Sequence, residues 1–177
     1  LETGGNGHAV LGWADDRNAS GFYDIYTQRI DQNCNTLLSD ADAGGKIVCN
    51  IGTAELLTRH PRITYMNEAA NVMVWEDYRN SSNTDVYLQI LDNEGNGLLQ
   101  ENGIPISVSD DDQYLPRIKA DSDYVYVIWE DLRNSAIFSD IYAQKVSLDG
   151  AIMWEENGLA LCTETRKQYG ARLTTDG

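Results

Sequence analysis

The chain has 177 residues, of which 28 are acidic and 13 are basic, and its formal net charge at pH 7 is −15. This balance argues against nucleic acid or an anionic membrane as a partner, because no basic stripe is present to release counterions. No apolar run reaches the roughly 20 residues that a membrane-spanning helix needs. The charge is compatible with high solubility, with a saline or calcium-rich medium, or with a cationic partner.

Short strands separated by Gly, Asn and Asp turns follow one another along the chain, and no stretch has helical periodicity. A Gly-rich entry precedes the first of them. The predicted strands of the first repeat are 10–13, 24–30 and 46–49, those of the second are 62–65, 72–76, 85–91 and 103–107, and those of the third are 117–120, 124–130, 140–146 and 158–162.

One sequence pattern occurs three times and divides the chain into units of 1–60, 61–115 and 116–170, with 171–177 starting a further unit. In each copy, Trp-x-Asp-x-Arg-Asn is followed by Asp-Ile/Val-Tyr-x-Gln; the three copies begin at Trp13, Trp75 and Trp129. Such self-similarity is the sequence signature of a repeat architecture. The first unit begins at its second strand, so we expect its first strand to be missing.

The fold that these units predict is all-β, a β-propeller with blades of four antiparallel strands. The second strand of a unit is apolar on both faces, as in 72–76, which is typical of a strand covered on both sides. A closed propeller has at least four blades. The chain is therefore either a segment of a longer propeller or one of several copies that complete a ring, with Arg172 and Leu173 supplying the missing strand beside 10–13. A three-fold β-trefoil is the alternative fold.

The pattern resembles the repeat of β-propellers in large secreted or cell-surface bacterial proteins. The residues that carry the resemblance are Trp129, Asp131, Arg133, Asn134, Asp140, Ile141, Tyr142, Gln144, Asp149, Gly150, Trp154, Asn157 and Gly158. The resemblance implies a secreted or surface-located, non-catalytic binding or structural module that serves adhesion, surface or matrix assembly, or carbohydrate contact. Its partner would be a protein or glycan ligand, a second copy or the remainder of a longer propeller. The alternative function is a propeller-fold hydrolase or lyase acting on glycans.

The candidate metal ligands are aspartates that recur at the loop between the second and third strands of each unit. Several carboxylates on one rim could bind calcium, which takes oxygen ligands. The competing interpretation, which we favour, is that these carboxylates pair with Arg and cap loop amides, because a scaffold group appears in every repeat. No catalytic residue is assigned, and calcium is the one candidate cofactor. The six aspartates are Asp15, Asp24, Asp77, Asp85, Asp131 and Asp140.

Three cysteines are present, and none has the spacing of a zinc site. Cys34 and Cys49 flank a predicted hairpin and could close a local disulfide in an oxidising compartment. Cys162 would then be left as a free thiol or would pair outside this segment. Two further acidic clusters, Asp110–Asp112 and Asp40 with Asp42, are expected to be solvated turns.

Overall fold

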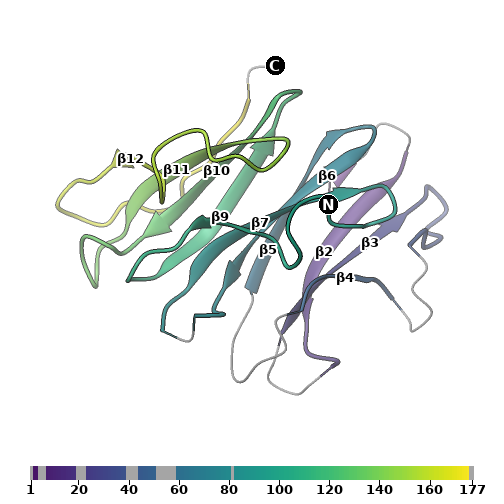
Figure 1. Cartoon of the computed structure of the whole chain (residues 1–177), viewed down its shortest axis with the longest axis horizontal. Coiled ribbons are helices and arrows are strands. Elements are labelled where there is room, and N and C mark those ends of the chain that lie inside the picture. Colours follow the sequence, from purple (N-terminus) through teal and green to yellow (C-terminus); the bar gives the residue numbers. More distant parts are fainter. Residues whose placement is uncertain are drawn as a thin grey trace.

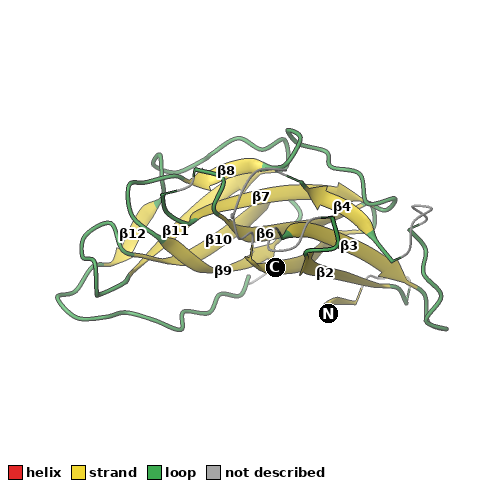
Figure 2. Cartoon of the chain, turned by 90° about the horizontal axis from the view of Figure 1, so that it is seen from below, coloured by secondary structure: helices red, strands yellow, loops and turns green. Residues whose placement is uncertain are grey.

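The structure is a computed structural model. It describes residues 7–18, 23–38, 44–50, 60–80 and 82–175 in full, and the backbone alone of residues 2–3 and 59. These residues contain no helix and form three antiparallel sheets of four strands each (Figure 2). The strands are β1 (Glu2–Thr3), β2 (Ala9–Asp15), β3 (Asp24–Ile30) and β4 (Lys46–Cys49) in the N-terminal sheet; β5 (Arg59–Asn67), β6 (Ala70–Asp77), β7 (Asp85–Asp92) and β8 (Ile104–Ser107) in the middle sheet; and β9 (Gln113–Ala120), β10 (Tyr124–Asp131), β11 (Asp140–Ser147) and β12 (Leu159–Cys162) in the C-terminal sheet.

Each sheet is a meander in which strands that follow one another in sequence pair side by side. The three sheets lie next to one another in chain order, from the C-terminal sheet at the left of Figure 1 to the N-terminal sheet at the right. The register repeats as well. The Trp of the second strand lies opposite the Tyr of the third strand, as Trp75 does with Tyr87 and Trp129 with Tyr142.

Two apolar clusters hold neighbouring sheets together. We call the face that a sheet turns toward the following sheet its forward face, and the other its backward face. The forward face of the N-terminal sheet packs through Ile25 and Val48 onto Met73 and Trp75 of the middle sheet. The forward face of the middle sheet packs in the same way onto the backward face of the C-terminal sheet; that cluster includes Val72, Val74, Leu88, Ile106, Val125, Val127 and Trp129.

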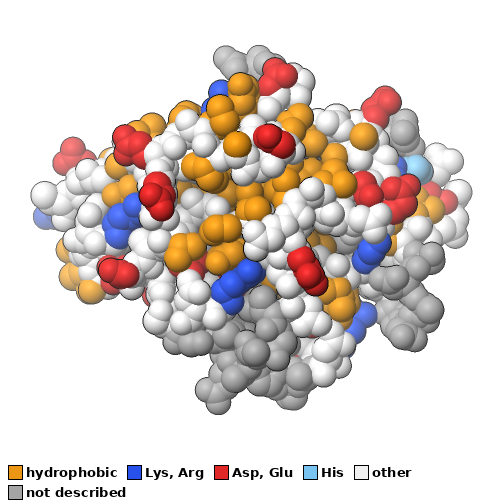
Figure 3. Space-filling model, viewed as in Figure 1, with side chains coloured by type: hydrophobic (Ala, Val, Ile, Leu, Met, Phe, Trp, Pro, Cys, Tyr) orange, Lys and Arg blue, Asp and Glu red, His pale blue; other side chains and the backbone are white. Residues whose placement is uncertain are grey.

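The middle sheet is consequently buried on both faces, which confirms the interpretation of its apolar second strand. Every residue of β6 is buried. Along β7 the side chains alternate between the two clusters, with Leu88 in one and Tyr87 in the other. On the face of the molecule seen in Figure 3, apolar side chains gather toward the middle and acidic side chains are dispersed around them.

The predicted strands at 24–30 and 46–49 agree with β3 and β4, and the other observed strands differ from their predicted bounds by a few residues. One prediction was wrong. The first unit does contain a first strand, because Glu2 and Thr3 pair with Val10 and Ala9. Two residues give too little alternation to be recognised as a strand in a sequence.

β5 and β9 begin before Pro61 and Pro116, whereas the sequence analysis started these strands just after the prolines, at Arg62 and Arg117. His60 and Leu115, which precede the two prolines, have positive φ of 51° and 52°, and the pairing register shifts beside each of them. Proline has no N–H for the ladder and disfavours helical backbone in the residue before it. The strand therefore passes the proline through a bulge.

The disulfide between Cys34 and Cys49 is absent, since both thiols are free. Cys34 is exposed in the turn after β3 and has a positive φ of 63°. Cys49 ends β4 with no exposed surface, and its Sγ lies 3.9 Å from Asp77 Oδ2 of the next sheet. Burial raises the pKa of the Cys49 thiol to about 12. Cys49 is thus a packing residue between two sheets.

Replacing either buried Trp by Ala should leave a cavity between two sheets. Trp75 and Trp129 are 0% and 1% exposed. We expect Trp75→Ala and Trp129→Ala each to lower the free energy of unfolding by about 3–5 kcal/mol, measured by chemical denaturation. Phe138→Ala is the matched control, because Phe138 is 40% exposed and should cost far less. Equal losses in all three variants would contradict the packing role.

Candidate functional site

The recurrent aspartate that follows each Trp lies at the centre of a hydrogen-bonded cluster. In the middle unit, Asp77 has no exposed surface. Its carboxylate accepts hydrogen bonds from the indole Nε1 of Trp75 (2.9 Å) and from both the backbone N–H and the guanidinium Nε of Arg79 (2.9 Å each). A buried carboxylate is tolerated only when donors of this kind surround it.

Arg79 connects this aspartate to the rest of its unit. Its guanidinium stacks on the ring of Tyr87, with 3.7 Å from Cζ to the ring centroid, and donates to the carbonyl oxygen of Asn102 at 2.8 Å. The next residue, Gly103, has a positive φ of 83°, and a Cβ there would lie 2.5 Å from the Trp75 ring. The recurrent spacing therefore reflects one cluster of contacts, which we call the Trp–Asp–Arg clamp. In the middle unit its members are Trp75, Asp77, Arg79, Tyr87 and Gly103.

The other two units repeat the contacts among Trp, Asp, Arg and Tyr, and the third unit also repeats the bond from the arginine to a carbonyl oxygen. In the first unit Arg17 hydrogen-bonds the carboxylate of Asp15 and lowers its pKa. Gly45 and Gly158 lie against the Trp rings of their units, as Gly103 does. The corresponding contacts are Trp13 Nε1 to Asp15 (2.9 Å), Arg17 Cζ to the Tyr26 ring (4.2 Å), Trp129 Nε1 to Asp131 (2.8 Å), Arg133 to the Asn157 carbonyl (2.8 Å) and Arg133 Cζ to the Tyr142 ring (4.0 Å).

The second recurrent aspartate opens the third strand and lies directly opposite the first, as in the pair Asp77 and Asp85. It accepts a hydrogen bond from the Asn that follows the clamp arginine. The donor-to-acceptor distances are 2.7 Å from Asn18 to Asp24, 2.5 Å from Asn80 to Asp85 and 2.7 Å from Asn134 to Asp140. The structure therefore brings the six candidate metal ligands together as three pairs, one in each unit.

In every pair, protein donors bind the carboxylate oxygens that a cation would need. Across the part of the chain that the structure describes, no group of three or more His, Cys, Asp or Glu side chains is placed to hold a metal ion. Asp112 of the Asp110–Asp112 cluster accepts the backbone N–H of Thr84 at 2.8 Å. Asp40 and Asp42 lie outside the described residues. Calcium at these pairs remains a hypothesis.

Asp85 differs from the other carboxylates in its electrostatics. Burial, followed by the negative charge of Asp77, raises the pKa of Asp85 to about 7, against the opposing hydrogen bonds from Asn80 and Asn83. A carboxyl that titrates near neutral pH is one mark of a general acid. Asp85 has no exposed surface, however, so its carboxyl is not accessible to a substrate.

The Gln at the end of each Asp-Ile/Val-Tyr-x-Gln pattern has a structural task that sequence reasoning did not assign. Gln89 accepts the backbone N–H of Leu99 at 2.9 Å and donates to the carbonyl of Gln100 at 2.9 Å. Gln28 and Gln144 hold the matching connection in their units. The recurrence of this Gln in all three units was the sequence signal that could have indicated a structural role.

A second class of arginine recurs near the start of successive units, with Arg62 on β5, Arg117 on β9 and Arg172 in the segment after β12. The sequence analysis assigned no binding role to these residues. Arg62, Arg117 and Arg172 each donate to a carbonyl of the residue just before them, at 3.2, 3.0 and 3.1 Å. Among the described residues none of the three has a carboxylate within ion-pair distance. Burial and then the like charges of Arg62 and Arg172 lower the pKa of Arg117, against the opposing charges of Glu130 and Glu76. We call these three residues the arginine row.

No family model, curated protein or solved structure matches the chain. The described residues include no helix that is long and apolar enough to cross a membrane. The fold and the two sets of arginines are therefore the basis for a functional proposal.

Chelation should distinguish the two interpretations of the paired aspartates. Because protein donors already occupy these carboxylates, we expect the melting temperature in excess EDTA to equal that in millimolar calcium chloride. The comparison is made by thermal unfolding of the same preparation after dialysis. A fall in melting temperature with EDTA that calcium restores would establish the metal site instead.

The raised pKa of Asp85 predicts a dependence of stability on pH. The folded state holds the proton up to about pH 7, whereas the unfolded carboxyl releases it near pH 4, so the stabilisation from Asp85 falls as pH rises through this window. Asp85→Asn removes the titration. From pH 4 to pH 8, we expect the parent to lose about 2–4 kcal/mol of unfolding free energy relative to Asp85→Asn.

The matched control for this titration is Asp110→Asn, because Asp110 is exposed in a connecting loop. Its difference from the parent should stay constant over the same pH range. Urea denaturation at pH 4, 6 and 8 gives all three free energies. A pH-independent difference for Asp85→Asn would refute the assignment.

Proposed function

We propose that the chain forms three blades of a β-propeller and serves as a non-catalytic binding and structural module of a secreted or cell-surface protein. Three features support the propeller: four-stranded meanders, face-to-face packing in chain order, and the same clamp in every unit. Separate four-stranded sheets of this kind suit blades around a centre better than the hairpins of a trefoil.

The observation that carries the binding role is the contrast between the two classes of arginine. The clamp arginines Arg17, Arg79 and Arg133 are each paired with an aspartate of their own unit. The arginine row has no such partner among the described residues. Arg62 and Arg117 lie on first strands, and Arg172 lies at the equivalent position of the segment after β12; in a propeller the first strands are nearest the central axis. A guanidinium presents a planar fork that matches carboxylate and sulfate oxygens.

We therefore infer that the ligand is an acidic glycan that bears carboxylate or sulfate groups, bound at the arginine row. The acidic surface elsewhere would repel such a ligand, so binding should be confined to the row. The alternative, a glycan hydrolase or lyase, receives support only from the raised pKa of Asp85. The burial of that side chain favours the binding role.

Arg117→Ala should separate binding from stability. We expect it to weaken the binding of polygalacturonate about tenfold or more, since a charge-assisted hydrogen bond contributes about 1.5–3 kcal/mol, and to leave the melting temperature unchanged. Affinity electrophoresis in gels that contain polygalacturonate measures the first effect, and thermal unfolding measures the second. Neutral dextran in the gel is the control ligand.

Arg133→Ala is the control variant, because it breaks a clamp and leaves Asp131 buried without its cation. It should lower the unfolding free energy by about 3–5 kcal/mol while the remaining folded protein still binds the glycan. A parent protein that migrates equally in polygalacturonate and dextran would exclude the proposed ligand. Unchanged binding by Arg117→Ala would exclude the row.

A further inference from the structure

The last described residues, 168–175, reproduce on the C-terminal sheet the place that β9 takes on the middle sheet. The backbone N–H of Gln168 donates to the Ser139 carbonyl at 2.8 Å, as that of Gln113 donates to the Thr84 carbonyl at 2.7 Å. These contacts differ by 55 positions at both ends, which is the repeat offset between the middle and C-terminal units.

A second pair of contacts repeats in the same way. The N–H of Gly170 donates to Glu130 Oε1 at 2.9 Å, as the N–H of Leu115 donates to Glu76 Oε1 at 2.7 Å. Gly170 also has a positive φ of 71°, like Leu115. Residues 168–175 are therefore held in the position of the first strand of a fourth sheet.

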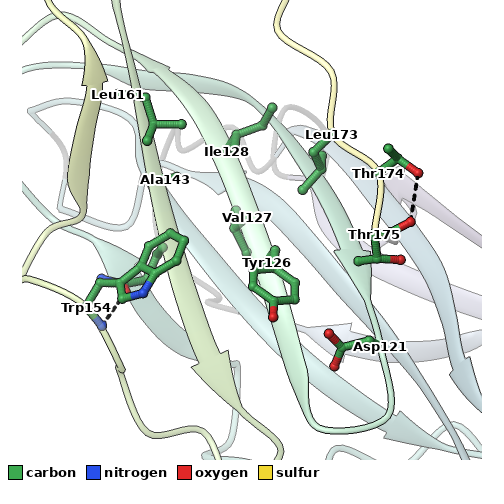
Figure 4. A pocket seen from close by; sticks show the side chains of 11 residues that line it. Asp121, Tyr126, Val127, Ile128, Ala143, Trp154, Leu161, Leu173, Thr174 and Thr175 are labelled. Carbon is green, nitrogen blue, oxygen red and sulfur yellow. Dashed lines mark hydrogen bonds between the residues drawn. The ribbon is translucent and has the colours of Figure 1, made fainter. Parts of the chain in front are cut away.

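Within the described part of the chain, no second strand pairs with this segment. β9 pairs with β10, whereas residues 171–175 take part in no sheet of the described structure. Leu173 instead lies over the forward face of the C-terminal sheet, beside a pocket of about 310 Å³ that Tyr126, Ile128, Trp154 and Leu161 also line (Figure 4). The pocket lies on the forward face of the C-terminal sheet. The forward face of the middle sheet is covered instead by the next sheet.

The opposite end of the molecule has the complementary gap. In the middle sheet, the first strand β5 pairs with β6 from Ala70 to Glu76. In the C-terminal sheet, the first strand β9 pairs with β10 from Val125 to Asp131. β2 has such pairing in the described residues only at Ala9 and Val10, through the two residues of β1. The first-strand edge of β2 from Leu11 to Asp15 carries no described partner. Among the described residues, no sheet packs on the backward face of this sheet, and Ile47 on that face is 41% exposed.

We propose that a second copy of this chain fills both gaps, with residues 168–173 of one copy added as a strand to the edge of β2 in the other. The register follows from β9 on β10, where Gln113, Tyr114, Arg117 and Ile118 lie opposite Asp131, Glu130, Ile128 and Val127. The equivalent pairs join Gln168 to Asp15, Tyr169 to Ala14, Arg172 to Gly12 and Leu173 to Leu11.

Residues 168–173 of the donated strand and the recipient's own β1 would take successive positions along this edge, and Thr174 and Thr175 would turn away from it. After Leu173 opposite Leu11, the next positions along the edge are Val10 and Ala9, and the recipient's Glu2 and Thr3 already occupy them. Strand addition to an open edge is an established mode of recognition, in which main-chain hydrogen bonds supply affinity. One continuous first strand would thus be assembled from two chains.

The same arrangement places matching faces against each other. Within the chain, a forward face packs onto a backward face twice, and Val127 and Trp129 are among the residues that fill the second of these contacts. Their equivalents in the N-terminal sheet are Leu11 and Trp13. In the second copy these two side chains would enter the pocket beside Leu173 and continue the established stacking.

Two copies give six sheets, which lies within the four to eight blades of closed propellers, whereas three copies would give nine. The ring then contains two identical head-to-tail contacts and closes on itself. This closure depends on the propeller proposed above. The strand addition depends only on the contacts and registers in the described residues.

Paired cysteines test the register. In a Cys34→Ser/Cys162→Ser background, we expect Leu11→Cys with Leu173→Cys to form a covalent two-chain species on mild oxidation, seen on non-reducing gels, because directly opposed strand residues are within disulfide reach. Leu11→Cys with Arg166→Cys is the control and should stay uncrosslinked. Failure of the first pair to crosslink, or equal crosslinking of both, would overturn the proposed register.

Light scattering tests the stoichiometry of the unmodified chain, for which we expect the mass of two chains. Leu173→Asp should convert it to a monomer with an unchanged circular dichroism spectrum, while Leu148→Asp, in a turn away from the contact, should leave the mass at two chains. A parent that is monomeric or forms open-ended chains would overturn the ring. A monomer that still bound polygalacturonate through Arg117 would overturn this inference and leave the proposed function standing.

Discussion

The structure depends on carboxylates that are fully buried and must be surrounded by donors. Asp77 and Asp131 meet this requirement with an indole N–H, a backbone N–H and a guanidinium from the same short segment. The guanidinium must then stack on a ring and reach a carbonyl at the start of the fourth strand. This single requirement fixes the spacing of Trp, Asp and Arg. It also accounts for the Tyr of the third strand and for the Gly that lies against the indole ring.

The clamps join strands within a sheet, whereas the apolar clusters join one sheet to the next, together with hydrogen bonds such as that from Leu115 N–H to Glu76. Neither apolar cluster includes both outer sheets, so the stack is stabilised by neighbour-to-neighbour contacts, as in other repeat proteins. The middle sheet has a neighbour on both sides, and its second strand is buried throughout. The outer sheets have one each, which is why Trp13 and Leu11 retain exposed surface while Trp75 and Met73 do not.

Most of the fold could be predicted from the sequence because strand alternation, turn chemistry and recurrence agreed with one another. The bulges at His60 and Leu115 could not, since a strand that continues past a proline depends on its partner strand. The clamp residues were identified and their structural role was favoured, but its geometry was not, because the carbonyl of Asn102 is distant in sequence. The arginine row was missed for a different reason. Whether a guanidinium has a carboxylate partner is a property of three-dimensional packing and not of spacing.

Every member of a clamp comes from one unit, from Trp75 through Gly103 in the middle of the chain. Recombination that inserted or removed a whole unit would therefore break no clamp, and it would join a forward face to a backward face as before. In the proposed propeller, such a change would alter only how many sheets surround the axis. A gene that encodes such a propeller could change the size of the ring in one step, with no compensating substitution in the units that remain.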